Sequence, residues 1–369
     1  MKKQLLLYIA ILGLSFVLIS WGSSGHYKIN QASGLSFNEE MAQFSDWISV
    51  LAAHASDADD RKSWDPTEGP KHYIDIDNYS EFISNGSIPM SWDSVINAHG
   101  SNFVYDNGIL PWATLITYDS LVSCFERHDL DKAVLFASDL GHYVADGHMP
   151  MHITRNYNGQ YTGNNGIHSR YESTMINAYI SQFDYNGFDI SEVNQVDQYV
   201  FNYLYSSYVY VDSILDADDY AESLAGSTSS SLYRQTLWDQ TQNFTIPLFS
   251  NASHALTELL YTAWIQAGSP AISPDGIYQN TKPIAQLNQN APNPFSTSTI
   301  ISYRLEGQTH VELSVYDLAG KPQATLVQGM KMRGDHSIQW NPEQVKPGVY
   351  ILTLQAGKTR KVKKIVLTE

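Results

Sequence analysis

The chain has 369 residues, long enough for two domains, and a hydrophobic content of 43% is sufficient for buried cores. Its only cysteine, Cys124, excludes an intrachain disulfide and is expected to be a buried, small apolar side chain. The net charge of −16 is uneven. Residues from Gln286 onward carry ten Lys and Arg against six Asp and Glu, and the remaining chain carries twelve against thirty-two. The acidic part would repel a polyanion at long range, which weighs against a nucleic-acid ligand without excluding one.

The N-terminal segment, residues 1–20, is predicted to be a secretory signal peptide. Lys2 and Lys3 precede an apolar run from Leu5 to Ile19, and Ser20 follows it. An uncleaved membrane anchor is the alternative. The run is shorter than the ~20 residues that span a bilayer, which favours cleavage. Cleavage after Ser20 would make Trp21 the first residue of a mature, secreted chain.

Residues 21–270 have the pattern of a mostly α-helical domain. Ser36-Phe-Asn-Glu39 is a candidate capping box for a helix that runs toward Ala55. Pro111 fits the first turn of a helix through Phe125, and Asp131 to His148 carries apolar residues at helical spacing. Further helices are predicted at about 168–182, 192–217 and 232–267, with a Ser-rich loop over 226–231.

Side chains of metal-ligating type are concentrated between residues 142 and 172. His142 and Asp146 are four residues apart, as are His168 and Glu172, and His152 lies between the two pairs. On a helix this spacing places both side chains of a pair on one face, where a single cation can bridge them. Imidazole and carboxylate together suit zinc better than magnesium or calcium. One such pair is usually a surface ion pair, whereas two pairs with a further His between them predict a zinc site.

The pattern changes after residue 270. Residues 271–289 are predicted to be a linker, and residues 290–369 a small antiparallel β-sandwich. Short alternating segments separated by turn residues indicate strands at 300–305, 311–316, 336–340, 349–354 and 363–367.

Further candidate ligands lie upstream, in Trp21-Gly-Ser-Ser-Gly-His26, in Ala58-Asp59-Asp60-Arg61 and in Lys71-His72-Tyr73. With the downstream pairs, they resemble over residues 21–270 the superfamily of zinc-dependent phospholipases C and S1/P1 single-strand nucleases. The resemblance implies three zinc ions and nine ligands, with Asp57 or Asp60 as alternatives to Asp59. The implied ligands are Trp21 (through its free amine and carbonyl), His26, Asp59, His72, His142, Asp146, His152, His168 and Glu172.

The same resemblance implies a role for each group of ligands. Asp59, His72, His142 and Asp146 would hold one ion, Trp21 and His26 a second that Asp146 bridges, and His152, His168 and Glu172 a third, more open ion. Zinc can supply hydroxide at neutral pH and positive charge for a phosphodiester transition state. Asp59 could also act as the general base. Arg155 and Arg170 are interpreted as surface charges, although either could contact phosphate.

The motifs divide between the two kinds of enzyme. Gly166-Ile-His168-Ser-Arg-Tyr-Glu172 is similar to the phospholipases, because the nucleases usually end this motif with Trp-Asp. The five-residue step from Trp21 to His26 is similar to the nucleases. Asp60 and Gly69 stand where choline-specific phospholipases carry aromatic residues, so choline specificity is not expected. We therefore expect a secreted phosphodiesterase, phospholipase C-like ahead of single-strand nuclease. A zinc-stabilised surface protein without catalysis is the third hypothesis.

The C-terminal segment carries a second resemblance. The motifs are Asn290-Ala-Pro-Asn-Pro-Phe295, Val315-Tyr-Asp-Leu-Ala-Gly-Lys321, Pro347-Gly-Val-Tyr350 and a basic finish. They resemble the C-terminal sorting domain of proteins that Bacteroidetes-like bacteria export by type IX secretion. This implies the secretion machinery as a partner and the cell surface or the exterior as the destination. An immunoglobulin-like accessory or carbohydrate-binding domain is the alternative.

Overall fold

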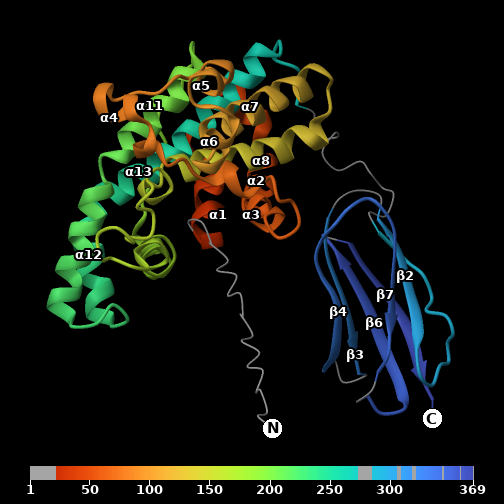
Figure 1. Cartoon of the computed structure of the whole chain (residues 1–369). Helices are drawn as coiled ribbons and strands as arrows, with labels where there is room; N and C mark the ends of the chain where they lie inside the picture. The colour runs from red at the N-terminus through yellow and green to blue at the C-terminus, as the bar shows by residue number, and fades with distance from the viewer. Residues whose placement is uncertain are drawn as a thin grey trace, which may run out of the picture. The chain divides into compact units, whose positions relative to one another are not determined.

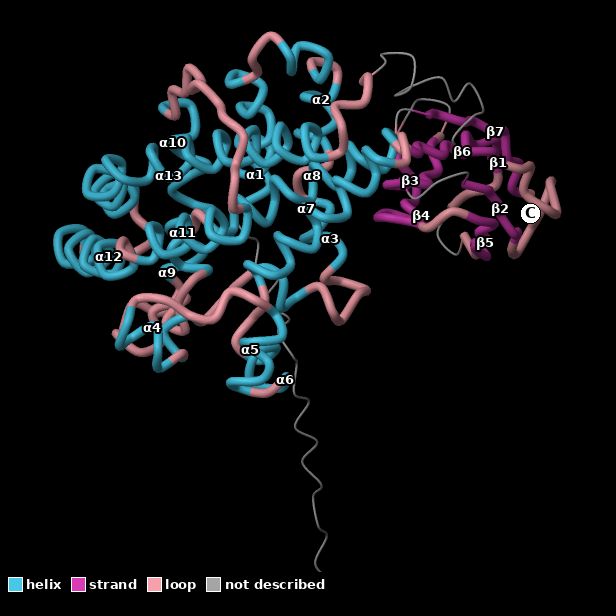
Figure 2. The backbone as a smooth tube through the Cα atoms, turned by 90° about the horizontal axis from the view of Figure 1, so that it is seen from above, coloured by secondary structure: helices cyan, strands magenta, loops and turns pink. Residues whose placement is uncertain are grey.

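The computed structural model describes residues 22–272, 285–305, 309–317, 321–342, 345–357 and 359–368. The expected signal peptide, Trp21 and most of the expected linker lie outside these residues. The chain divides into two compact units, with the division after Pro274 (Figure 1). Among the described residues, helices belong to the first unit and strands to the second (Figure 2). The expected fold class, a helical domain followed by a β-sandwich, is confirmed.

The first unit is built from α-helices joined by short 3₁₀ segments and loops. The α-helices are α1 (Gly22–Ser33), α2 (Trp47–Ala53), α3 (Asp57–Arg61), α4 (Ser80–Asn85), α5 (Trp92–His99), α6 (Ser101–Asp106), α7 (Leu110–Glu126), α8 (Leu130–Gly147), α9 (Ile167–Ser169), α10 (Ile176–Tyr179), α11 (Val196–Tyr208), α12 (Val211–Ala225) and α13 (Ser231–Gln266). The 3₁₀ segments are η1 (Gly34–Ser36), η2 (Glu40–Phe44), η3 (Gly69–His72), η4 (Ile76–Asn78), η5 (Pro150–His152) and η7 (Ile180–Gln182), and η6 (Arg170–Met175) is a π-helical turn.

Three long helices, α7, α8 and α13, pack against one another, and α1 packs against α8 and α13. An aromatic cluster closes this core, because Trp47 stacks on Phe125 at 5.8 Å and Phe44 meets both rings and Trp264 edge-on. Full burial of one such side chain stabilises the fold by roughly 1.5–3 kcal/mol. Cys124 is buried on α7, as expected. No helix in the described part of the chain is long and apolar enough to cross a membrane.

Several local predictions hold and several are wrong. The expected helices with Pro111 in the first turn and over 131–148 are α7 and α8. The capping box at Ser36 is wrong, because its hydroxyl bonds the Tyr185 hydroxyl at 2.5 Å and accepts from the Phe188 N–H. The expected helix over 192–217 is broken after α11 and resumes as α12, and the one over 168–182 contains the π-helical turn η6.

The second unit consists of two antiparallel sheets. The strands are β1 (Ala285–Leu287), β2 (Thr299–Leu305), β3 (Thr309–Tyr316), β4 (Pro322–Lys331), β5 (Gly334–Trp340), β6 (Gly348–Ala356) and β7 (Thr359–Leu367). One sheet has the order β1-β2-β5 and the other β4-β3-β6-β7, and a buried core that includes Phe295, Trp340 and Leu352 lies between them. All five expected strands are present, and β1 and β4 were not predicted.

Candidate metal centre

Eight of the nine expected ligands converge in the first unit. His26 lies on α1, Asp59 on α3, His72 at the end of η3, and His142 and Asp146 on α8. His152 ends η5, His168 lies on α9 and Glu172 on η6. They form three groups of ligand atoms: His26 with His142 and Asp146; Asp59 with His72 and His142; and His152 with His168 and Glu172. Trp21, the ninth, lies outside the described residues.

A glycine brings the first of these helices against the central one. A Cβ at Gly141 would lie 2.2 Å from Asn30 Oδ1 on α1 and 2.7 Å from Leu256 on α13. Asn30 in turn donates to the carbonyls of Leu51 and Ser138, at 3.0 and 3.2 Å. This close approach of α1 to α8 allows the His26 ring to stack on His142, with centroids 3.8 Å apart.

The first two ligand groups share His142, and short contacts surround its side chain. Its Nε2 lies 3.0 Å from His72 Nδ1, 3.3 Å from Asp146 Oδ2 and 3.6 Å from Asp59 Oδ1. Asp146 contacts His72 Nδ1 at 3.0 Å through Oδ2 and His26 Nε2 at 3.5 Å through Oδ1. The Asp146 carboxylate therefore faces a ring nitrogen of His72 in one group and of His26 in the other.

The third group is built around Glu172. Its two oxygens face different rings, Oε2 at 3.1 Å from His152 Nε2 and Oε1 at 3.2 Å from His168 Nε2. The two imidazoles stack with centroids 4.9 Å apart. The spacing of His168 and Glu172, four residues apart, predicted the contact between them, although Glu172 lies on a π-helical turn rather than on a regular α-helix.

Backbone carbonyls orient three of the imidazoles. Nδ1–H of His142 donates to the Ala55 carbonyl at 2.7 Å, and that of His152 to the His72 carbonyl at 2.7 Å. His168 Nδ1 makes a longer contact, 3.3 Å, to the Tyr157 carbonyl. With the proton on Nδ1, Nε2 carries a lone pair directed at the centre, the arrangement typical of His ligands to a metal.

Two observations fit these groups to zinc. Four ligands at about 2.0–2.1 Å from a tetrahedral ion lie roughly 3.3 Å from one another, and the contacts above run from 3.0 to 3.6 Å. In addition, His168 Nε2 and Glu172 Oε1 are buried and make no hydrogen bond among the described residues. Buried polar atoms usually have a partner, and a shared cation would satisfy both.

The charge balance of the centre keeps its carboxylates ionised. Burial opposes ionisation of Asp146, but His142 and His152 outweigh it and hold the pKa of Asp146 well below its usual range. Burial likewise opposes the lowered pKa of Glu172, which His168 and His152 produce. Burial also works against protonated His152, yet Asp146 and Glu172 raise the pKa of His152 to about 9, so zinc would have to displace the Nε2 proton to use that lone pair. The centre is thus a cluster of compensated charges.

The alternatives to Asp59 lie outside the ligand groups found among the described residues. Asp57 pairs with His54 at 2.7 Å, and among the described residues neither Asp57 nor Asp60 belongs to the three ligand groups. Asp59 Oδ1 lies 3.6 Å from His72 Nδ1 and from His142 Nε2, and 2.5 Å from Lys62 Nζ. The geometry favours Asp59 as the third carboxylate of the centre.

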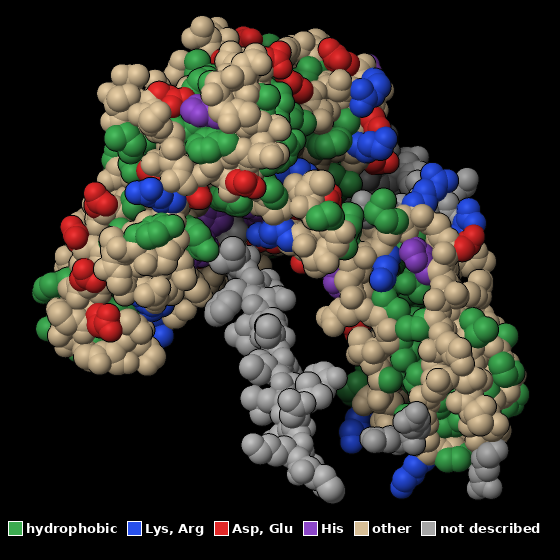
Figure 3. Space-filling model, viewed as in Figure 1, with side chains coloured by type: hydrophobic (Ala, Val, Ile, Leu, Met, Phe, Trp, Pro, Cys, Tyr) green, Lys and Arg blue, Asp and Glu red, His purple; other side chains and the backbone are tan. Residues whose placement is uncertain are grey.

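A cavity of about 470 Å³ opens beside the ligands. His72, His152 and His168 line it together with Lys62, Gly69, Pro70, Tyr73, Asp75, Asp106, Met151 and Tyr157. Burial and the neighbouring Asp77 raise the pKa of Asp75 to about 7. Acidic side chains also outnumber basic ones on the visible face of the first unit (Figure 3). Lys62 is the single Lys or Arg among the lining residues.

The two arginines near the centre differ from each other. Arg155 is exposed, with its guanidinium over the Tyr161 ring, as expected of a surface charge. The same expectation is wrong for Arg170, whose side chain is 17% exposed and donates three hydrogen bonds, at 2.7, 2.9 and 3.3 Å, to the fully buried Asp218. Arg170 also donates to the carbonyls of Asn164 and Asn165, so it fastens the loop before His168.

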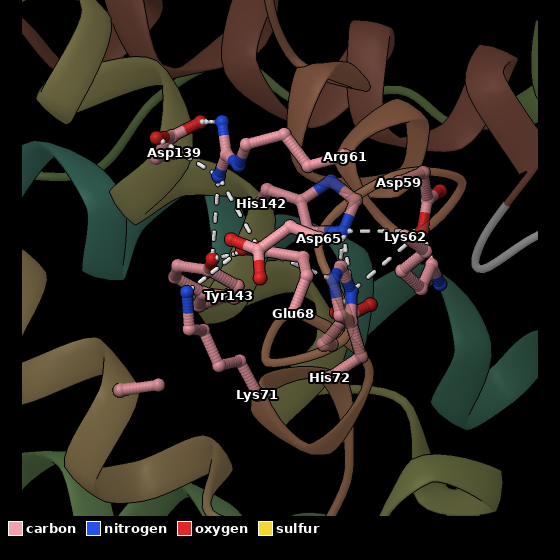
Figure 4. A network of polar contacts seen from close by, with 12 residues as sticks. Asp59, Arg61, Lys62, Asp65, Glu68, Lys71, His72, Asp139, His142 and Tyr143 are labelled. Carbon is pink, nitrogen blue, oxygen red and sulfur yellow. Dashed lines mark hydrogen bonds and ion pairs between the residues drawn. The ribbon is translucent and has the colours of Figure 1, made fainter.

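A network of charged side chains, which the sequence did not predict, adjoins His72 (Figure 4). Glu68 contacts Tyr143, Lys71, Arg61 and His72, and Arg61 continues to Asp139. The signal available in the sequence was the spacing of Glu68 and His72, four residues apart, as in the two recognised pairs.

Comparison with solved structures gives low similarity over nearly the whole chain. Alpha toxin from Clostridium absonum covers 95% of this chain and 96% of its own, with a TM-score of 0.41 and 10% identity. Alpha-toxin from an avian strain of Clostridium perfringens covers 94% and 97%, with a TM-score of 0.39 and 11% identity. No curated protein sequence matches the chain. The chemistry of the first unit is therefore inferred from its own side chains.

The second unit has a clear relative. Residues 291–368 match the family described as secretion system C-terminal sorting domain. The matched segment begins one residue after the expected start of the domain and includes β2 to β7. Its edge strand β7 carries Lys361, Lys363 and Lys364, and lysines are common on edge strands because they discourage further pairing. The chain thus carries a type IX sorting domain, which implies contact with the secretion machinery and export to the cell surface or the exterior.

Proposed function

We propose that the helical unit is a zinc-dependent phosphodiesterase of the phospholipase C kind, with ligands Trp21, His26, Asp59, His72, His142, Asp146, His152, His168 and Glu172. The observation that carries the proposal is the presence of three His and carboxylate groups, almost wholly buried, beside a cavity that His72, His152 and His168 line. Zinc would supply hydroxide at neutral pH and positive charge for the phosphoryl oxygens. We further propose that residues 1–20 are removed as a signal peptide, freeing the amine of Trp21 for the centre.

Different side chains would have different roles in such a reaction. Asp146 and His142, both fully buried, would bind an ion through a carboxylate and an Nε2 lone pair where water has little access. Asp59, which is 15% exposed, is the carboxylate able to accept a proton from an attacking water. His152 and His168 line the cavity, so a phosphate in the cavity could reach the group around Glu172.

Charge supports a phospholipid over a nucleic-acid strand. Asp75 and Asp106 line the cavity, Lys62 is the one Lys or Arg that lines it, and the chain before Gln286 is strongly acidic. A polyanionic strand would meet repulsion along its length, whereas a phospholipid presents one phosphodiester and an uncharged glycerol linkage. Pro70 and Met151 add apolar surface to the cavity. One observation favours the nuclease alternative, since Tyr73 and Tyr157 both line the cavity and could stack on bases.

Turnover by the zinc-loaded chain beginning at Trp21 tests the proposal. Mixed phospholipid micelles are compared with single-stranded DNA and RNA, using His152→Ala as the inactive variant. His254→Ala, a histidine outside the three ligand groups, is the matched control that keeps activity. Release of diacylglycerol and phosphorylated headgroup by the wild type and His254→Ala supports the phospholipase. Cleavage of single strands with inert lipid identifies the nuclease, and full zinc binding without turnover identifies a non-catalytic surface protein.

A further inference from the structure

His72 presents a different ring atom to the centre from the other imidazoles. His142 and His152 each donate Nδ1–H to a carbonyl and turn Nε2 toward the ligand groups. His72 turns Nδ1 inward, 3.0 Å from both Asp146 Oδ2 and His142 Nε2. Its Nε2 therefore points outward, where Glu68 Oε1 lies at 3.5 Å.

This orientation fixes what His72 needs from its surroundings. A neutral imidazole that ligates through Nδ1 carries its proton on Nε2. His72 is 3% exposed, and its Nε2 makes no hydrogen bond of good geometry among the described residues. A buried N–H without an acceptor is destabilising. Glu68 is the carboxylate in contact with this atom, at 3.5 Å from Oε1.

Glu68 is itself held firmly in place. It is 1% exposed, receives Lys71 Nζ at 2.8 Å on Oε2, and receives a very short hydrogen bond from the Tyr143 hydroxyl on Oε1. Arg61 Nη2 lies 3.3 Å from Oε1 and is anchored by Asp139 at 3.0 Å. An ammonium, a guanidinium and a phenol hydroxyl therefore surround the Glu68 carboxylate and fix its position.

We propose that Glu68 is a positioning residue for His72, which fixes its ring as an Nδ1 ligand with the proton on Nε2. The Tyr143 ring meets His72 edge-on at 5.6 Å and donates to the same Glu68 oxygen, so side chain and acceptor are held as one assembly. The inference rests on the metal-binding part of the proposed function. It assigns to Arg61, Lys71 and Tyr143 the role of holding the Glu68 carboxylate against His72 (Figure 4).

Zinc affinity measured site by site tests this role without relying on activity. The mature chain is titrated with zinc against a chelator of known affinity, and cobalt(II) absorption follows the same sites. Loss of an outer partner of a ligand histidine lowers metal affinity by about 10–100-fold. We expect Glu68→Ala to weaken one site to this degree and to leave the other sites unchanged. Glu68→Gln, which keeps an oxygen acceptor without the charge, should lie between Glu68→Ala and the wild type.

Controls separate positioning from general support of the fold. Glu81→Gln removes a carboxylate that pairs with His99 at 2.5 Å, outside the ligand groups, and should leave all zinc affinities unchanged. If Glu68→Ala fails to fold, Glu68→Gln and Tyr143→Phe decide the matter, each with a smaller loss at the same site. Variants that unfold earlier on heating yet bind zinc at every site with wild-type affinity would overturn the proposal. A wild-type chain that binds no zinc would overturn both this inference and the proposed function.

Discussion

Replacing Arg170 by Met should destabilise the helical unit more than the same replacement of an exposed arginine does. Arg170 bonds both oxygens of Asp218, whose side chain is fully buried, and also bonds the Asn164 and Asn165 carbonyls. Removal of one partner from a buried ion pair costs about 3–5 kcal/mol, because the remaining charge stays out of water. Tyr233 and Asn164 still donate to Asp218 in the variant, which points to the lower end, about 3 kcal/mol.

The assay is thermal unfolding followed by far-UV circular dichroism of the helices, which reports on the first unit. For a unit of this size, about 3 kcal/mol corresponds to a fall in Tm of roughly 6–12 °C. Arg155→Met, with an exposed guanidinium over Tyr161, is the control and should change stability by less than about 1 kcal/mol. Zinc concentration is kept equal in all samples, because bound metal raises Tm by itself.

A double variant checks the cause. Arg170→Met combined with Asp218→Leu removes both charges, so it should recover part of the stability lost in Arg170→Met alone. Equal unfolding temperatures for Arg170→Met and Arg155→Met would refute the reasoning, because the buried carboxylate would then have needed no partner.

Three other outcomes follow from the structure. Chelation of zinc should lower Tm, since each site filled at 100 times its dissociation constant adds about 2.7 kcal/mol, and an unchanged Tm after complete metal removal would contradict the metal centre. The hydrogen bond from His54 to Asp57 raises the pKa of His54 above 6.5, so its stabilisation is present below pH 6.5 and is lost as pH rises through the folded-state pKa. NMR titration should show this raised pKa, and Asp57→Asn should abolish it. Asp75→Asn should increase turnover of anionic relative to zwitterionic phospholipids by about tenfold, or ~1.4 kcal/mol, and more above pH 7 than below, because Asp75 has a pKa of about 7. An unchanged preference would remove Asp75 from substrate selection.

Local spacing predicted the parts of the centre that lie within one helical segment. His142 with Asp146, and His168 with Glu172, are contacts between residues four apart, which a repeating backbone determines. His26, Asp59 and His72 were assigned only from the resemblance. These residues are brought to the centre by tertiary packing, such as the contact that Gly141 allows. Spacing along the chain does not predict such packing.

The errors have equally specific causes. Ser36 has the residues of a capping box around it, yet its hydroxyl is used by Tyr185, far away in sequence. β4 is an edge strand whose burial does not alternate, and its register against β3 shifts twice, so the period of two disappears. β1 has three residues, too few for a pattern. Arg170 resembles a surface charge until α12 brings Asp218 against it.

The dispersion of the ligands along the chain has a consequence for how the unit holds together. Its ligand atoms come from segments between His26 and Glu172, brought together in a chain whose single cysteine cannot form an internal disulfide. An ion that joins such distant segments closes long loops, and loop closure removes conformational entropy from the unfolded chain. Zinc capture after export would therefore act as a set of covalent-like cross-links, strongest against full unfolding and reversible by a chelator.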